Sequence, residues 1–100
     1  MERATGKCPR ICKSKEEILN DPQIAAVIIS TSWEQHIPLA IEAMKHGKYA
    51  GIEVGGSYAL EDCWSLVRTA KETGMHCMLL ENCCYGKWEL MICCLHRAML

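Results

Sequence analysis

The fold of this protein is decided by residues 25–54, which read AAVIISTSWEQHIPLAIEAMKHGKYAGIEV. The stretch opens and closes on apolar runs, residues 25–29 and 49–54, neither of which alternates between apolar and polar residues. Such runs are typical of strands that are covered on both faces. Between them, apolar side chains recur at helical spacing at Ile37, Ala40, Ile41 and Met44. The stretch therefore predicts a strand, an amphipathic helix and a second strand.

The same pattern continues further along the chain. A third apolar run at residues 76–80 predicts another strand. Two more helical stripes flank this run, and we expect them to help cover the sheet: Leu60, Cys63, Trp64 and Val67, then Trp88, Met91, Ile92 and Leu95. Gly47 and Gly74 stand just past the first two of the three stripes, where a helix stop in the left-handed conformation favours glycine.

Together these elements predict an α/β fold, a partial Rossmann-type doubly wound parallel sheet of order βαβαβα that is incomplete. Parallel strands need crossover connections, which the helices supply. Three strands are fewer than a sheet usually has, so both sheet edges are expected to be bare. A shorter helix is expected earlier, because Ser14 and Glu17 have the spacing of a capping box and Asp21-Pro22 would end it. We expect one unit over residues 1–100.

Composition narrows the possible functions. Half of the 100 residues are hydrophobic and 23% are charged, which excludes a disordered tail. The net charge of −1 argues against a nucleic acid or an anionic membrane as partner. No apolar run approaches the roughly 18 residues of a membrane span, and residues 1–13 show no secretory signal. We therefore expect a cytoplasmic protein, although a longer parent could carry an export signal upstream.

Eight cysteines lie at positions 8, 12, 63, 77, 83, 84, 93 and 94. No two of them have the Cys-x-x-Cys spacing that presents a pair of thiolates to one zinc ion. Cys63 falls on an apolar helix stripe and Cys77 in an apolar run, where free cysteine acts as a small buried hydrophobe. We therefore expect reduced cysteines and no metal, with a metal site or a redox-active site as the alternative.

In an open α/β sheet, ligands bind beyond the carboxyl ends of the strands. That rule selects three segments, residues 31–36, 53–57 and 81–85. The first offers N–H groups at a helix start, the flat face of Trp33 and the ring nitrogens of His36. The second places a carboxylate before two glycines, which permit close backbone approach. The third contains Asn82, which can both donate and accept.

Each segment also has a purely structural interpretation. Trp33 can pack while Thr31 or Ser32 caps the helix, Glu53 can be solvated beside a flexible turn, and Asn82 can be an ordinary turn residue. Other motifs are absent from the sequence. It contains no Gly-x-Gly-x-x-Gly, and residues 51–57 lack the lysine that a phosphate-binding P-loop requires.

The series of motifs resembles one family. It runs TSWEQH (residues 31–36), AMKHGK (43–48), IEV (52–54), LEDCWSLV (60–67) and MLLENCCY (78–85). Over about residues 20–90 this series is similar to the Gfo/Idh/MocA family of NAD(P)-dependent oxidoreductases. The Trp-Glu-x-His and Leu-Glu-Asn-Cys-Cys-Tyr strings point within it to glycoside hydrolase family 109, the alpha-N-acetylgalactosaminidases that use NAD.

The resemblance implies a set of contacts with the dinucleotide in the same three segments: Trp33, Glu34, Gln35, His36, Glu53, Val54 and Asn82. It implies a bound NAD that oxidises a sugar hydroxyl, after which the leaving group is eliminated, water adds and the hydride returns. The protein would position the nicotinamide against the sugar and supply acid–base groups. The tyrosines and the arginine that hold the sugar in that branch have no counterpart in this sequence, and the catalytic residues stay unknown.

The sequence departs from the family in several places. Plain dehydrogenases of the family carry Glu-Lys-Pro where this chain has Glu53-Val54-Gly55, so the missing lysine favours the glycosidase branch. That branch usually has proline in the third place, and Gly55 is expected to loosen the turn. The resemblance also places the N-terminal glycine-rich βαβ unit before residue 1 and the substrate domain after residue 100. Residues 1–100 are therefore interpreted as the central part of the NAD-binding domain, with weak or no NAD binding and no activity by themselves.

A non-catalytic function is the alternative. A truncated Rossmann module could act through contacts with its own copies or with a partner, using the bare sheet edge and the apolar helix faces. The sequence does not indicate the sugar, its anomeric form, or the choice between NAD and NADP.

Overall fold

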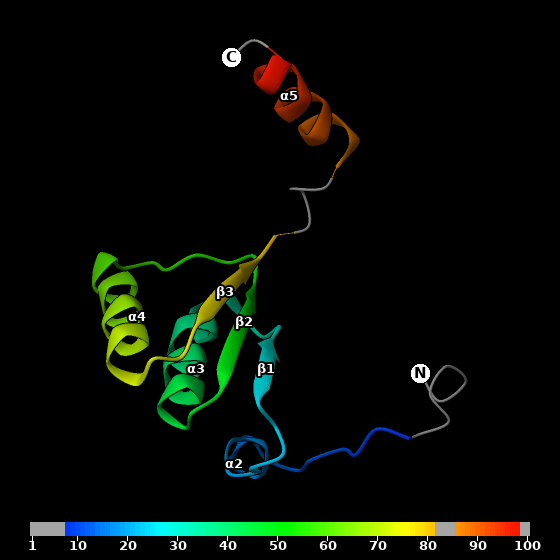
Figure 1. Ribbon diagram of the computed structural model, residues 1–100. Coiled ribbons are helices and arrows are strands. Elements are labelled where there is room, and N and C mark those ends of the chain that lie inside the picture. The colour runs from blue at the N-terminus through cyan, green and yellow to red at the C-terminus, as the bar shows by residue number, and fades with distance from the viewer. Residues whose placement is uncertain (1–7, 82–85, 99–100) are drawn as a thin grey trace.

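The computed structural model describes residues 8–81 and 86–98 (Figure 1). Its elements are α2 (Lys15–Leu19), β1 (Ala26–Ile29), α3 (Trp33–Lys45), β2 (Tyr49–Glu53), α4 (Leu60–Thr73), β3 (Cys77–Leu80) and α5 (Lys87–Ala98). The three predicted strands are confirmed, and each end lies within one residue of its predicted position. The helices predicted before, between and after the strands are also confirmed.

The strands form one parallel sheet in the order β1-β2-β3. Ile29 pairs with Ile52, and Glu53 pairs with Leu80, so the three strands leave the sheet at the same edge. Helix α3 packs on β1 and β2, and α4 packs against α3 (Figure 1). The predicted α/β fold, a partial Rossmann-type sheet with helical crossovers, is therefore confirmed.

The core lies between α3 and the sheet. Ala40 and Met44 of α3 have no exposed surface, and they pack with Ala50 and Ile52 of β2 and Ile29 of β1. The apolar stripe predicted for α3 is therefore the face that the sheet buries. The opposite face of the sheet is exposed, with Ile28 at 75% and Met78 at 65% of their full accessible surface.

The stripe predicted to bury α4 is wrong. Leu60 and Trp64 are 73% and 56% exposed, and Cys63 is exposed as well. The buried side of α4 consists instead of Leu66, Thr69 and Ala70, of which Leu66 and Ala70 pack against the core. Successive residues of a helix differ by about 100° around its axis. Helix α4 packs against α3 rather than on the middle of the sheet. The side of α4 that becomes buried is therefore the one next to the predicted stripe.

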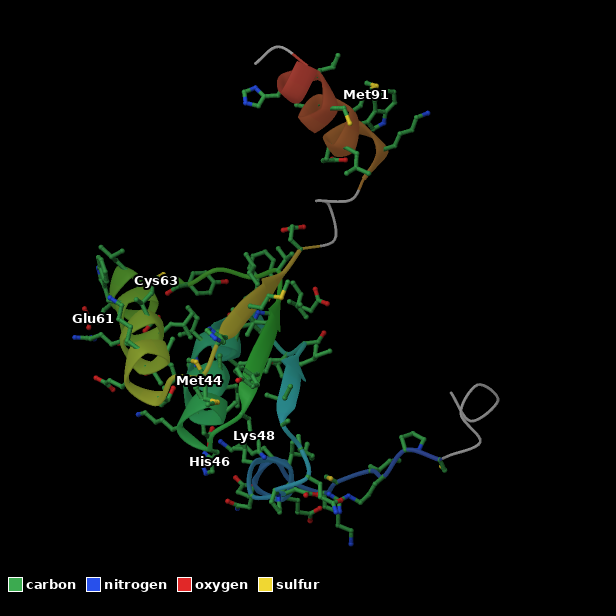
Figure 2. All side chains as sticks on the ribbon, in the orientation of Figure 1. Met44, His46, Lys48, Glu61, Cys63 and Met91 are labelled. Carbon is green, nitrogen blue, oxygen red and sulfur yellow. The ribbon has the colours of Figure 1, made fainter. Side chains whose placement is uncertain are left out.

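The stripe predicted for α5 is also exposed. Trp88 is 63% and Ile92 65% exposed, and Figure 1 shows α5 apart from the sheet. Figure 2 shows Met91 on this helix and Cys63 on α4. The radius of gyration is 17.0 Å, against about 13 Å for a compact domain of 100 residues. The expectation that all three stripes cover the sheet holds for α3 alone.

The predicted helix stops are confirmed, whereas the capping box is not. Gly47 has φ 71° and Gly74 has φ 69°, which is the left-handed region that favours glycine. Ser14 stands at the N-cap of α2 but its side chain makes no capping hydrogen bond. The Glu17 carboxylate accepts instead from the backbone N–H of Lys13, 3.2 Å away, one residue before the N-cap. The donor N–H is thus one residue earlier than in a capping box, so the reciprocal pair does not form.

Candidate functional site

Two of the three segments selected from the sequence meet at one edge of the sheet. Residues 31–36 connect β1 to the first turn of α3, and residues 53–57 connect β2 to α4. Because β1 and β2 are parallel and in register, both connections leave the sheet at its carboxyl edge. The third segment follows Leu80, which pairs with Glu53 at the same edge. Asn82 itself lies outside the described residues.

Gly55 is the point of closest approach between these two segments. The residue is buried, and a Cβ atom built on it would lie 2.8 Å from Trp33 Cδ1 and 2.9 Å from His36 Nδ1. Both distances are shorter than a carbon side chain tolerates. The turn therefore lies directly on the first turn of α3, and Gly55 packs it closely rather than loosening it.

His36 forms the floor of this contact. Its side chain is 1% exposed, and Nε2 lies 3.1 Å from the carbonyl oxygen of Thr31. A carbonyl can only accept, so Nε2 carries the proton and donates. Nδ1 is buried without a hydrogen-bond partner among the described residues. Nδ1 is therefore an unused hydrogen-bond acceptor directly beneath the turn. Leaving a buried acceptor unpaired lowers the stability of the fold by about 1–3 kcal/mol.

The remaining predicted side chains are accessible. Trp33 is 56% and Val54 42% exposed, Glu34 and Gln35 are exposed, and Glu53 is half-buried. Trp33 thus holds one edge of its indole against Gly55 while much of the ring faces solvent. The edge combines an aromatic surface, an apolar side chain and carboxylates within two short connections.

The start of α3 offers backbone donors at this edge. Ser32 is the N-cap, and its side chain makes no capping hydrogen bond. The leading N–H groups of a helix point outward and carry a partial positive charge, which attracts anionic groups. Glu34 in the first turn offsets part of that charge. Pro38 lies inside the helix and has no N–H to give to the carbonyl of Glu34.

A polar turn borders this edge at Ser57, which lies in the selected segment 53–57 but was given no role from the sequence. Ser57 Oγ accepts from the N–H of Ala59 at 3.0 Å and lies 2.5 Å from the Ala59 carbonyl oxygen and 3.0 Å from Asp62 Oδ2. A cavity of about 100 Å³ lies beside it, lined by α3, the turn and α4: Trp33, Glu34, Ile37, Pro38, Gly56, Ser57, Tyr58 and Asp62. A serine two residues before the N-cap of a helix was the available signal.

Two larger cavities lie beside β1. One of about 710 Å³ lies beside β1, where Arg10 and Asp21 form an ion pair at 2.5 Å, and it is also lined by Ile24 and Ala26. Another of about 160 Å³ has an apolar lining from α2, β1 and α3, including Leu19. Neither brings together the side chains selected from the sequence.

The cysteines differ in exposure. The free thiols, which form no disulfide bond, include those of Cys8, Cys12, Cys63, Cys77 and Cys94. Burial raises the pKa of the Cys77 thiol. Within residues 8–81 and 86–98, no three histidine, cysteine, aspartate or glutamate side chains gather in a group that could hold a metal ion. In the same part of the chain, no helix is both long enough and apolar enough to cross a membrane.

Comparison with protein families places this chain beside known enzymes. The family described as "Oxidoreductase family, NAD-binding Rossmann fold" (GFO_IDH_MocA) matches residues 4–80. Glycosyl hydrolase family 109 protein 3 of Phocaeicola vulgatus is 46% identical over 78 residues, covering 78% of this chain and 14% of that protein. The alpha-N-acetylgalactosaminidase of Shewanella oneidensis is 47% identical over 79 residues, covering 79% and 17%. The chain thus spans between 14% and 17% of the length of these two relatives.

Solved structures are similar as well. An NAD-binding protein from Listeria innocua has a TM-score of 0.72 and 33% identity, covering 82% of this chain and 24% of that one. A protein described as an oxidoreductase, yvaA of Bacillus subtilis, has a TM-score of 0.86 and 26% identity, covering 97% of this chain and 28% of its own. The arrangement of strands and helices described above is therefore shared with both.

Proposed function

Because this chain belongs to the Gfo/Idh/MocA oxidoreductase family, whose NAD-binding Rossmann fold its residues 4–80 match, we propose that it forms the central part of the dinucleotide site of a sugar-acting enzyme. We further propose that NAD is the dinucleotide and that the enzyme is a glycosidase that works by transient oxidation of the sugar. The names of the family 109 relatives support this class of activity.

The observation that carries the proposal is the contact between the two connections at the carboxyl edge. A Cβ atom at Gly55 would lie 2.8 Å from Trp33, so the residues after β2 lie against the first turn of α3. Proteins with this type of sheet bind dinucleotides at that edge. The candidate contacts Trp33, Glu34, Gln35, His36, Glu53 and Val54 all lie in or beside these connections, and Asn82 completes the proposed set.

The residues suit a dinucleotide in different ways. Trp33 presents a flat ring on which a base or a nicotinamide can stack. The N–H groups at the start of α3 suit oxygens that carry negative charge. The Glu53 carboxylate can accept from a ribose or sugar hydroxyl, and Val54 offers an apolar contact. When bound, the dinucleotide supplies reversible hydride transfer, and these residues hold and orient it.

The test of this site compares two tryptophans with the same exposure. Trp33 and Trp64 are each 56% exposed, but Trp64 lies in the second turn of α4, outside both residues 31–36 and residues 53–57. We expect NAD to give saturation-transfer NMR signals with the natural chain and with W64A, and these signals to disappear with W33A. Equal signals from W33A and W64A would contradict the proposed site.

We expect the 100-residue chain by itself not to hydrolyse an aryl N-acetylgalactosaminide in the presence of NAD. The sequence contains no glycine-rich phosphate loop. Three charge-assisted hydrogen bonds of roughly 1.5–3 kcal/mol each would be missing, which weakens binding by about a thousandfold or more. Measurable turnover by the purified chain would contradict this expectation.

A second function is favoured by the exposed apolar surface. Ile28 and Met78 face solvent on one side of the sheet, and large exposed apolar surfaces often mark interaction sites. We propose as the alternative a non-catalytic module that associates with its own copies or with a partner through this sheet. Analytical ultracentrifugation would show a mass that rises with concentration, whereas a monomer at high concentration would exclude self-association. The cytoplasmic location stays a prediction from the sequence.

A further inference from the structure

We infer that Gly55 and His36 are positioning residues, which together set how closely the turn at residues 54–57 approaches Trp33. The inference rests on the proposed function only where it concerns the dinucleotide, because the contact itself is a property of the fold. In this arrangement the ring of His36 packs beneath the turn and supports it. The exposed indole of Trp33 is then the side chain that contacts the ligand.

The missing side chain at position 55 makes the contact possible. A Cβ atom there would lie 2.8 Å from Trp33 Cδ1, 2.9 Å from His36 Nδ1 and 3.0 Å from Trp33 Cγ. Non-bonded carbon atoms prefer separations of about 3.5–4.0 Å. The backbone of Gly55 thus occupies a position that any residue with a Cβ atom could reach only if the tryptophan, the histidine or the turn moved.

His36 is held in place by burial and by a hydrogen bond. Its ring is 1% exposed and its Nε2 donates to the carbonyl of Thr31 at 3.1 Å. The turn is held at both of its ends as well, by the pairing of Glu53 with Leu80 in the sheet and by the contact of Ser57 Oγ with Asp62 at 3.0 Å. Of the two residues that a Cβ atom at position 55 would meet, Trp33 is 56% exposed and has room to rotate.

A side chain at position 55 is therefore expected to displace the indole of Trp33. The turn would stay attached to the sheet and to α4, while the indole of Trp33 would leave its position against Gly55. The proposed ligand could then no longer contact residues 31–36 and residues 53–57 at the same time. Binding would weaken although G55A removes no side chain that contacts the ligand.

The experiment compares G55A with G56A. Gly56 is adjacent in sequence, has an ordinary backbone conformation, and a Cβ atom there would meet nothing within 4 Å. The measured quantity is the chemical shift of the Trp33 indole N–H, assigned with W33F, with the signals of Trp64 and Trp88 as internal references. We expect a shift in G55A that exceeds the changes at both reference residues, and no such shift in G56A.

An unchanged Trp33 signal in folded G55A, or an equal change in G56A, would overturn the inference. Position 55 has φ 158°, so G55A can also lose stability through its backbone. The double variant W33A/G55A separates the two effects, because removing the indole should restore part of the stability that G55A loses. An identical loss of stability in both backgrounds would contradict the contact, and that outcome can be read even if G55A alone is largely unfolded.

The ligand arm of the experiment measures NAD affinity. We expect G55A to bind NAD about tenfold more weakly than the natural chain, which is a change of about 1.4 kcal/mol. Absence of NAD binding by the natural chain, together with the expected Trp33 shift in G55A, would contradict the weak NAD binding proposed for residues 1–100 and support the positioning role. Normal NAD affinity in G55A would contradict the positioning role toward the ligand.

Discussion

The ammonium of Lys48 donates to the backbone carbonyl of Asp21 at 2.7 Å, across a sequence separation of 27 residues. A second hydrogen bond of 2.7 Å reaches the carbonyl of Ile24, and the whole side chain is only 3% exposed. Figure 2 shows Lys48 at the end of the sheet where α2 lies, opposite the proposed binding edge. The lysine joins the segment before β1 to the start of β2, so it is a structural residue of the fold.

Replacing Lys48 by methionine should lower the free energy of unfolding by about 3–6 kcal/mol. Hydrogen bonds to a charged donor contribute about 1.5–3 kcal/mol each, and two buried carbonyls would lose their partner. The control is K15M, because Lys15 makes an exposed ion pair with Glu42 at 2.8 Å, and such pairs contribute about 0–1 kcal/mol. Urea unfolding followed by circular dichroism measures both. An equal loss of unfolding free energy in K48M and K15M would show that the buried hydrogen bonds of Lys48 add no more stability than an exposed ion pair.

Core packing should make Met44 far more important than Met78. Met44 is completely buried between α3 and the sheet, whereas Met78 is 65% exposed. M44A should destabilise the protein by about 2–5 kcal/mol because it leaves a cavity. M78A should change the stability by less than about 0.5 kcal/mol. Thermal and urea unfolding of both variants test this, and a similar loss in M78A would mean that the exposed face is covered in solution.

Acid should remove the stabilisation that Asp21 contributes. The N–H of Gln23, at 2.9 Å, and the guanidinium of Arg10 hold the pKa of this carboxyl below its ordinary value of 3.8. A lowered folded-state pKa means that the stabilisation is complete above the ordinary pKa and is lost as pH falls through the folded value. D21N should therefore be less stable than the natural protein at pH 7 and equally stable near pH 2. A difference that is independent of pH would contradict this account.

Thiol reactivity should separate Cys77 from Cys63. Burial raises the pKa of Cys77, and Cys63 is exposed on α4. The thiolate is the reactive form, so Cys77 has both less of it and poorer access to reagent. At pH 8 we expect alkylation of Cys77 to be at least about tenfold slower than that of Cys63. Mass spectrometry of digested peptides gives the rate at each site. The rates after unfolding serve as the control and should be equal at the two sites. Equal rates in the native protein would indicate that reagent reaches Cys77 in β3 as easily as Cys63.

Much of the backbone could be predicted from the sequence because its signals are local. The runs that become β1, β2 and β3 are apolar over consecutive residues, and Gly47 and Gly74 adopt the left-handed conformation expected of helix stops. The meeting of residues 31–36 and 53–57 at one edge also follows, because parallel strands send their carboxyl ends the same way. These features depend on the backbone and on hydrophobic periodicity, which neighbouring residues determine.

Burial of individual side chains could not be predicted in the same way. The stripes of Leu60 and Trp64 on α4 and of Trp88 on α5 have the same spacing as the stripe of α3, yet they are exposed. Spacing shows that a helix has an apolar face, but the partner that covers it comes from distant parts of the chain. His36 and Lys48 show the opposite case, since polar side chains are buried where backbone carbonyls receive them.

Local residue patterns by themselves determined the strands, the helices, the helix stops and the edge at which the candidate site lies. Only the tertiary structure decided that α4 rests on α3 through Leu66 and Ala70, that Lys48 joins two segments, and that Gly55 packs on Trp33 and His36. The physical reason is distance along the chain. Secondary structure depends on residues a few positions apart, whereas close packing and buried hydrogen bonds depend on groups that only folding brings together.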